Sequence, residues 1–107
     1  QSCILVDNKS STISILFENK NNLGADNALI INSSAKIFLE KNNKLFDIIF
    51  FDPPFTLVDV YPLLFEIKNH LKPQGVIYFE TNKKYSGEEF KILKNSRAGQ
   101  VYFYLLQ

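Results

Sequence analysis

The segment Asp52-Pro53-Pro54-Phe55 contains the residue types needed to hold and orient an amino group. Proline has a fixed φ and no N–H, and it pushes the residue before it into an extended conformation. The turn is therefore stiff, and its carbonyl oxygens have no local donors competing for them. The carboxylate of Asp52 adds another acceptor, and the ring of Phe55 offers a surface on which a base can stack.

An exocyclic amino group on an aromatic base suits such a set of acceptors. Its nitrogen is a poor nucleophile, because the lone pair is delocalised into the ring. Two acceptors on its hydrogens can hold it in a geometry that favours attack on an electrophilic methyl group, so catalysis is mostly positioning. The alternative is a structural turn, with Phe55 in the core and Asp52 capping the next helix. The position after an apolar strand in an alternating pattern favours the catalytic interpretation.

Two further polar features follow predicted strands. Asp7 ends the apolar run 3–6, and an acid at a strand tip can bind the two hydroxyls of a ribose. Its alternative role is to cap the helix that follows. Ser33, Ser34 and Ala35 come shortly after the apolar run 28–31, where hydroxyl or backbone groups can contact an adenine edge. A capped helix start is the alternative for this stretch, and the local sequence favours it.

Other reactive residue types have plainer interpretations. His70, the single histidine, lies near a predicted helix end, where a cation suits the helix dipole. Cys3 is predicted to be a small core residue. A single cysteine excludes a disulfide framework and a cysteine-based metal site, and we expect no metal site. The loop with Lys83 and Lys84 is predicted to be solvated rather than bound to phosphate.

Strands and helices alternate along the chain to position these residues. Apolar runs predict buried strands at 3–6, 28–31, 46–51 and 76–80. Helical spacing predicts a helix that stops at Gly24, with Ser10, Ser11 and Thr12 offering oxygens to cap its start. Two further helices are predicted, one around 37–39 and one over 60–71 with a stop at 72–75. Segments 88–94 and 100–106 predict a closing antiparallel pair around Ala98-Gly99.

This alternation predicts an α/β fold with a mainly parallel sheet whose strands are covered on both faces. Ligands of such sheets bind at the carboxyl ends of the strands. Asp7, the stretch 32–34 and Asp52-Pro53-Pro54-Phe55 all follow strands. We therefore expect them to lie along one edge of the sheet.

Length and composition limit the remaining choices. The chain has 107 residues, 46% hydrophobic, with a net charge of +1, which suits one globular domain and neither requires nor excludes a nucleic-acid partner. No apolar run is long enough to span a bilayer, and no signal peptide is evident, so a reducing, cytoplasmic setting is expected. The chain has no Met and opens close to a strand. We expect residues 1–107 to be the C-terminal part of a single domain.

The motif after the strand 46–51 resembles that of S-adenosylmethionine-dependent methyltransferases that act on amino groups. Two further stretches, Ile31-Asn32-Ser33-Ser34-Ala35 and Ala98-Gly99-Gln100-Val101, resemble the RsmD family of 16S rRNA guanine-N2 methyltransferases. The resemblance covers essentially the whole chain. It implies a Rossmann-like methyltransferase fold. It also implies that the full-length protein is a monomer.

The resemblance also implies a reaction and a site. The reaction is methyl transfer from S-adenosylmethionine to N2 of a guanine in 16S rRNA, within the small ribosomal subunit or its assembly intermediate. Asp52, Pro53, Pro54 and Phe55 match the catalytic motif. Asp7 matches the ribose-binding acid, and Ser34-Ala35 match the pair beside the adenine, where related enzymes often have Asp-Ala.

One departure concerns the start of the cofactor site. The family begins it with a strand and a Gly-rich loop, and nothing in the chain matches them. That strand lies in mid-sheet, between the strand ending at Asp7 and the strand 46–51. Its absence exposes two strand edges, so we expect this chain alone to be poorly active and of low stability. Two alternatives stay open: a fragment of a DNA adenine-N6 methyltransferase, and an inactive remnant that binds RNA or a partner.

Overall fold

The computed structural model describes residues 2–54 and 60–107. The chain divides into two compact units, residues 1–42 and residues 43–107, and each is described by itself. No described helix is long and apolar enough to cross a membrane.

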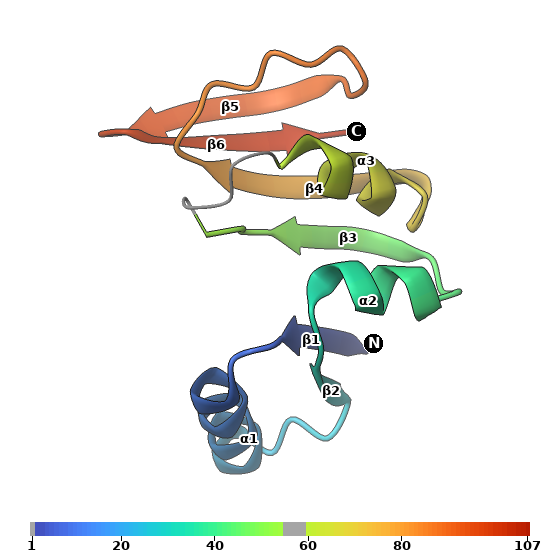
Figure 1. The fold of residues 1–107 in the computed structure, drawn as a ribbon, viewed down its shortest axis with the longest axis vertical. Coiled ribbons are helices and arrows are strands. Elements are labelled where there is room, and N and C mark those ends of the chain that lie inside the picture. The colour runs from blue at the N-terminus through green and yellow to red at the C-terminus, as the bar shows by residue number, and fades with distance from the viewer. Residues whose placement is uncertain (1, 55–59) are drawn as a thin grey trace. The chain divides into compact units, whose positions relative to one another are not determined.

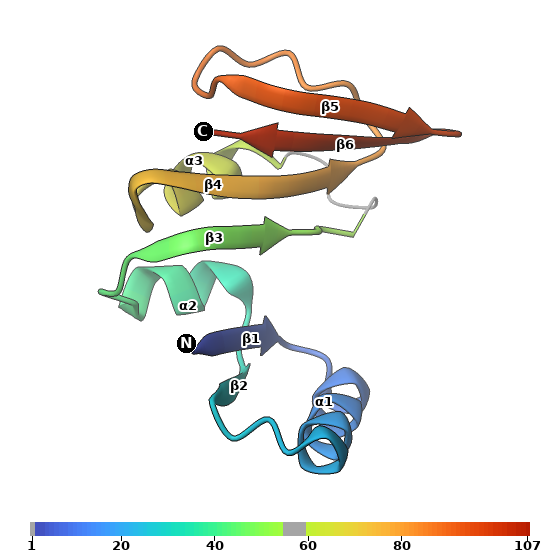
Figure 2. The same cartoon turned by 180° about the vertical axis from the view of Figure 1, so that it is seen from behind.

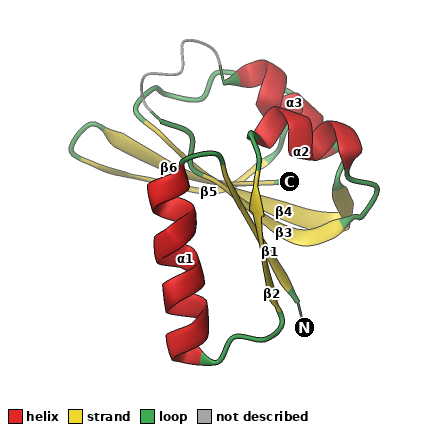
Figure 3. Ribbon diagram, turned by 60° about the horizontal axis from the view of Figure 1, so that its bottom comes forward, coloured by secondary structure: helices red, strands yellow, loops and turns green. Residues whose placement is uncertain are grey.

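The first unit has four elements in the order strand, helix, strand, helix (Figure 3). They are β1 (Cys3–Asp7), α1 (Ser10–Leu23), β2 (Ala28–Asn32) and α2 (Ala35–Lys41). The two strands pair in parallel, from Cys3 opposite Ala28 to Asp7 opposite Asn32. Both apolar runs predicted as strands, and both predicted helices, are present. The prediction that these two strands are buried is wrong, because no residue of β1 and only Ile30 of β2 is buried.

The two ends of α1 match their prediction to different degrees. Gly24 takes a left-handed conformation at φ 63°, and its N–H donates to the carbonyl of Asn21, so the predicted stop is confirmed. The start differs. The residue that precedes the helix is Lys9, with no side-chain cap, and Ser10 is already the first helical residue. The prediction that Ser10, Ser11 or Thr12 caps this helix is wrong.

The second unit is a four-stranded sheet with one helix (Figures 1 and 2). Its elements are β3 (Phe46–Phe51), α3 (Tyr61–Lys68), β4 (Leu71–Thr81), β5 (Ile92–Ala98) and β6 (Val101–Leu106). The strand order is β3-β4-β6-β5. β3 and β4 are parallel, whereas β6 is antiparallel to both β4 and β5. The predicted parallel strands and closing antiparallel pair are therefore both present.

The core of the second unit lies between α3 and one face of the sheet. In both views α3 lies over β4 (Figures 1 and 2). Its residues Leu64 and Ile67 are buried, as are Ile77, Phe79 and Leu106 of the sheet. Each such side chain contributes about 1.5–3 kcal/mol by leaving water. This face is the most firmly packed part of residues 43–107.

The opposite face of this sheet differs from the prediction of strands covered on both sides. Phe50 is 74% exposed and Ile48 is 54% exposed. The reason is that residues 43–107 supply only one described helix, and it covers the other face. In the first unit Cys3 is exposed, so the prediction of a buried core cysteine is also wrong.

The chain leaves α3 earlier than its apolar stripe predicts. The helix ends at Lys68 rather than near Leu71, because Leu71 already belongs to β4 and lies opposite Phe46. The left-handed residue in the stop signal is Gln74, at φ 66°, and not Gly75. Gly75 is needed for another reason. A Cβ there would lie 2.9 Å from the carbonyl oxygen of Lys72.

The closing hairpin is shifted relative to its predicted bounds. Its first strand is Ile92–Ala98 instead of 88–94, while the second agrees to within a residue. Ala98 lies opposite Val101, which leaves a two-residue loop with Gly99 at φ 60°. This pattern is typical of a type II′ turn. The turn therefore sets the register and extends the first strand to Ala98.

Candidate active site

Asp52, Pro53 and Pro54 continue directly from the carboxyl end of β3. Asp52 and Pro54 are exposed, whereas Pro53 is buried. The fourth residue of the motif, Phe55, lies outside the described residues. A buried proline next to an exposed carboxylate fixes the chain direction, because its ring restricts both its own φ and the residue before it.

Packing of the preceding residue anchors this segment. Phe51 is 7% exposed, and its ring stacks on that of Phe79, with centroids 5.4 Å apart and planes inclined by 13°. The same two residues lie opposite each other in the parallel pairing of β3 and β4. The alternative that Asp52 caps the next helix is wrong, because Val60 precedes α3 and no side chain caps it.

Asp7 lies at the carboxyl end of β1 in the first unit. Its Oδ1 accepts a hydrogen bond from the backbone N–H of Lys9 at 2.8 Å. Asp7 is therefore not the residue that caps α1, and that alternative is wrong as well. The bond holds one carboxylate oxygen towards the chain, so the other is available for a hydroxyl group.

Ser34 caps α2, and Ala35 is the first residue of that helix. The Ser34 hydroxyl accepts a hydrogen bond from the N–H of Ile37 at 3.2 Å, so the capped helix start is confirmed. The N–H of the neighbouring Ser33 donates to the carbonyl of Asp7 at 2.9 Å. This bond continues the β1–β2 ladder and brings Asp7 and the start of α2 to one edge of the sheet.

The predicted convergence is therefore met within the first unit. Asp7 and Ser34-Ala35 lie together at the carboxyl edge of β1 and β2. Asp52 belongs to the second unit, which is described separately. Its position along the same edge as Asp7 stays a prediction.

Comparison with known proteins identifies the family. The model of the family described as conserved hypothetical protein 95 matches residues 1–107. Ribosomal RNA small subunit methyltransferase D of Haemophilus influenzae is 36% identical in an alignment of 90 residues that covers 78% of this chain and 47% of that protein. The chain belongs to the RsmD family.

Solved structures agree with the RsmD assignment. The Escherichia coli protein yhhF, provisionally classed as a methyltransferase, superimposes with a TM-score of 0.89 at 26% identity, over 99% of this chain and 62% of that one. The ribosomal protein L11 methylase of Lactobacillus delbrueckii gives a TM-score of 0.79 at 17% identity, over 100% of this chain and 57% of that one. The second likeness shows the fold alone. The predicted fold class, a Rossmann-like methyltransferase fold, is confirmed.

This RsmD-family chain spans about half the length of the curated relative it matches.

His70 is buried, and its Nε2 lies 3.7 Å from the carboxylate of Glu66. His70 comes two residues after the end of α3. Residues 2–54 and 60–107 contain no group of three or more His, Cys, Asp or Glu side chains placed to hold a metal ion.

Sequence reasoning missed a network of tyrosines in the second unit. The Tyr104 hydroxyl accepts a hydrogen bond from the N–H of Tyr85, whose own hydroxyl accepts one from the N–H of Phe90. Burial raises the pKa of the Tyr85 phenol above its ordinary value, and the bond from Phe90 opposes the change. The signal was the alternation of Tyr102 and Tyr104 in β6, which places both rings on one face.

Proposed function

We propose that the protein carrying this chain transfers a methyl group from S-adenosylmethionine to the N2 amino group of a guanine in 16S rRNA. The observation that carries the proposal is the Asp52-Pro53-Pro54 turn at the carboxyl end of β3 in an RsmD-family chain. The 36% identity to a small-subunit rRNA methyltransferase supports the choice of RNA.

Asp52 is the group we assign to the amino substrate. Its exposed carboxylate can accept a hydrogen bond from an N–H of the amino group. The backbone carbonyl of Asp52 can accept a second one, because the prolines that follow have no N–H to compete for it. Two accepted bonds fix both hydrogens and leave the nitrogen lone pair directed at the methyl donor. As the bond to the methyl carbon formed and the methyl–sulfur bond broke, the nitrogen would become positively charged, and the negative charge of Asp52 would stabilise it. One of its two protons would then leave to water, and S-adenosylhomocysteine would be the second product.

The first unit supplies the residues we assign to the cofactor. Asp7 has one carboxylate oxygen held by Lys9 N–H and the other available to a ribose hydroxyl. Ser34 and Ala35 lie next to it at the start of α2, where a hydroxyl and an exposed backbone can contact an adenine edge. This donor and acceptor set fits a nucleoside. When bound, S-adenosylmethionine supplies the electrophilic methyl group.

We further propose the setting in which this reaction takes place. The substrate is the small ribosomal subunit or its assembly intermediate, and the full-length enzyme acts as a cytoplasmic monomer. The similarity to a small-subunit rRNA methyltransferase supports this choice of substrate.

The test compares Asp52→Ala with Asp47→Ala in the full-length protein. Asp47 is a matched control, because it is an exposed aspartate near the amino end of the same strand. Small subunits are incubated with S-adenosylmethionine that carries a tritiated methyl group, and the nucleosides are identified by mass spectrometry. We expect N2-methylguanosine, a loss of at least about 100-fold in rate for Asp52→Ala, and little change for Asp47→Ala.

Cofactor binding is measured in parallel by calorimetry. Asp7→Ala should weaken S-adenosylmethionine, whereas Asp52→Ala should leave its affinity nearly unchanged. Near-normal turnover by Asp52→Ala would contradict the role of Asp52. Methylation of adenine N6 in DNA would show that the substrate is DNA and not 16S rRNA. Binding of RNA without any methyl transfer would indicate an inactive remnant.

A further inference from the structure

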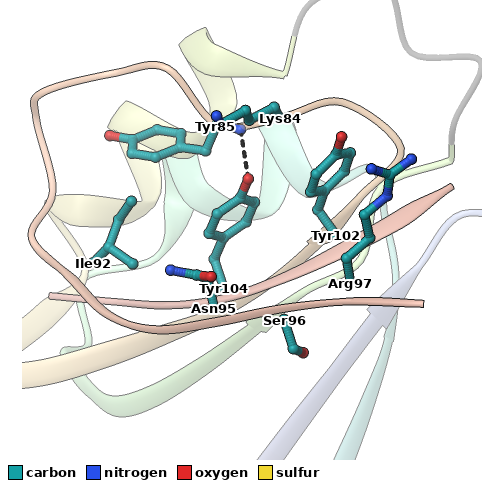
Figure 4. A pocket seen from close by; sticks show the side chains of 8 residues that line it. All are labelled: Lys84, Tyr85, Ile92, Asn95, Ser96, Arg97, Tyr102 and Tyr104. Atoms are coloured by element: carbon teal, nitrogen blue, oxygen red, sulfur yellow. Dashed lines mark hydrogen bonds between the residues drawn. The ribbon is translucent and has the colours of Figure 1, made fainter. Parts of the chain in front are cut away.

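The closing hairpin of the second unit carries a pocket of about 340 Å³ (Figure 4). β5 and β6 form its floor, and the loop after β4 lies across it. The side chains that define it are Lys84, Tyr85, Asn95, Arg97, Tyr102 and Tyr104. None of these residues belongs to the proposed catalytic motif or to the cofactor residues.

The floor is made of two cross-strand pairs. Arg97 lies opposite Tyr102, and Asn95 lies opposite Tyr104. Because side chains alternate along a strand, both pairs project from the same face of the hairpin, while Ser96 points away from it (Figure 4). The rings of Tyr102 and Tyr104 are nearly parallel, with planes inclined by 9° and centroids 6.3 Å apart. The floor is therefore a row of planar groups.

Hydrogen bonds hold the loop above this floor. The N–H of Tyr85 donates to the Tyr104 hydroxyl at 2.8 Å, and Tyr85 is only 5% exposed. The Tyr85 hydroxyl in turn accepts the N–H of Phe90. A loop fixed at these points keeps the backbone of the adjacent Lys84 beside the pocket, so the backbone needs little further ordering on binding.

Arg97 is also held in place. Its Nε donates to the carbonyl of Gly99 at 2.8 Å, and its guanidinium carbon lies 5.1 Å from the centroid of the Tyr102 ring. An arginine presents five N–H donors in a planar group, so several stay available after one is used. The turn at Gly99 thus orients a cation and a planar surface toward the pocket.

The charge around the pocket is positive. Residues 82–107 contain five basic and two acidic residues, while the whole chain has a net charge of only +1. Among the residues that line the pocket, Lys84 and Arg97 are basic and none is acidic. A polyanion is the ligand that this surface favours.

We propose that this pocket binds one unpaired nucleotide of the RNA substrate, near the nucleotide that is methylated. The base lies against the Arg97–Tyr102 pair, the carboxamide of Asn95 bonds the base edge, and Lys84 contacts the phosphate. Unpaired RNA bases are recognised by aromatic rings, guanidinium planes and amide groups in this way. The inference rests on the proposed function, because it names a second contact of the same substrate.

The strand order places this pocket within reach of Asp52. β3 and β4 both end at one edge of the sheet, and Tyr102 lies opposite Thr81 at the same edge. From β3 to β5 there are three strand spacings, which amounts to about 14 Å. One single-stranded segment can therefore extend from Asp52 to Arg97 across the second unit.

The experiment measures RNA affinity directly, without cofactor or catalysis. A fluorescein-labelled single-stranded 12-nucleotide RNA of mixed sequence is titrated with the full-length protein, and fluorescence anisotropy gives the Kd. We expect Arg97→Ala and Tyr102→Ala each to raise the Kd at least about fivefold. Arg97→Lys should lose most of the same affinity, because a lysine has the charge but no planar group.

The control is Lys72→Ala, which removes one positive charge at the opposite end of β4. It should change the Kd by less than about twofold, and circular dichroism checks that every variant is folded. Equal affinity of wild type, Arg97→Ala and Tyr102→Ala would overturn the proposal. So would failure of the wild-type protein to bind this RNA, or equal competition by poly-glutamate.

The result is separable from the proposed function. The anisotropy assay needs neither cofactor nor methyl transfer, so RNA affinity and the rate of methyl transfer are scored independently. If no methyl transfer is found and the Arg97 and Tyr102 variants still weaken RNA binding, the pocket stands and the enzymatic role fails. If methyl transfer is found and those variants bind normally, the pocket fails alone.

Discussion

The Tyr104 hydroxyl accepts the backbone N–H of Tyr85 across 19 residues of sequence, at a distance of 2.8 Å. Both residues are 5% exposed, so water cannot readily replace either partner. This bond ties the loop after β4 to the middle of β6. The attachment of the loop at Tyr85 therefore rests on the Tyr104 hydroxyl group.

Replacing Tyr104 with Phe removes that hydroxyl and keeps the ring. The N–H of Tyr85 then stays buried without its acceptor, which costs about 1–3 kcal/mol. Urea denaturation should show a free energy of unfolding lower by that amount. Tyr102→Phe is the control, because Tyr102 is more exposed and its phenol makes no described hydrogen bond that holds the loop. Equal losses in the two variants would contradict this account.

Alkaline pH should destabilise the protein through Tyr85. Burial raises the pKa of its phenol, so at high pH the unfolded chain loses this proton before the folded protein does. The contribution of Tyr85 to the free energy of unfolding is fully present below pH 10, the ordinary pKa of a tyrosine phenol. It is lost as the pH rises through the pKa of Tyr85 in the folded protein. Denaturation between pH 9 and pH 11.5 should show a steeper fall for wild type than for Tyr85→Phe.

Gly75 should not tolerate a larger side chain. A Cβ there would lie 2.9 Å from the carbonyl oxygen of Lys72 and 3.0 Å from that of Phe46, and backbone atoms cannot easily move. We expect Gly75→Ala to lower the free energy of unfolding by about 1–3 kcal/mol. At Gly24 nothing lies within 4 Å, so Gly24→Asn, which tolerates φ of +63°, should lose less than about 1 kcal/mol.

Ser34 gives a way to separate a structural role from a cofactor role. Ser34→Ala removes the hydroxyl that caps Ile37 and should cost about 1 kcal/mol, whereas Ser34→Asp keeps an acceptor and should restore the stability. Thermal unfolding measures this part. If Ser34 also contacts the adenine, calorimetry should show weaker S-adenosylmethionine binding for Ser34→Ala. Unchanged affinity would leave the residue as a cap alone.

The sequence predicted the elements whose signal is local. The apolar runs at 3–6, 28–31 and 46–51 became β1, β2 and β3 within a residue, because a run of apolar side chains is distinctive by itself. β5 was placed four residues early. Its sequence Ile-Leu-Lys-Asn-Ser-Arg-Ala has no period-two alternation, and only the turn at Gly99 and the pairing with β6 set its register.

The candidate site was predictable to a similar degree. Asp7 and Asp52 were found because each ends an apolar strand, and the structure places each at a carboxyl edge. The hairpin pocket was not predictable, because Lys84, Asn95 and Tyr102 come from three segments that only the strand register brings together. A helix that ends at Lys68 was missed for the same reason, since the pairing of Leu71 with Phe46 overrides the apolar stripe.

β5 has a consequence for how the protein behaves in concentrated solution. It is the outermost strand in the order β3-β4-β6-β5, so one of its two edges lacks a strand partner among the described residues. An open edge of this kind invites a second molecule to add a strand, which is the first step of aggregation. The side chains of Lys94 and Arg97 are exposed and carry like charges, so two such edges repel each other. The positive strand thus protects the protein from pairing with its own copies.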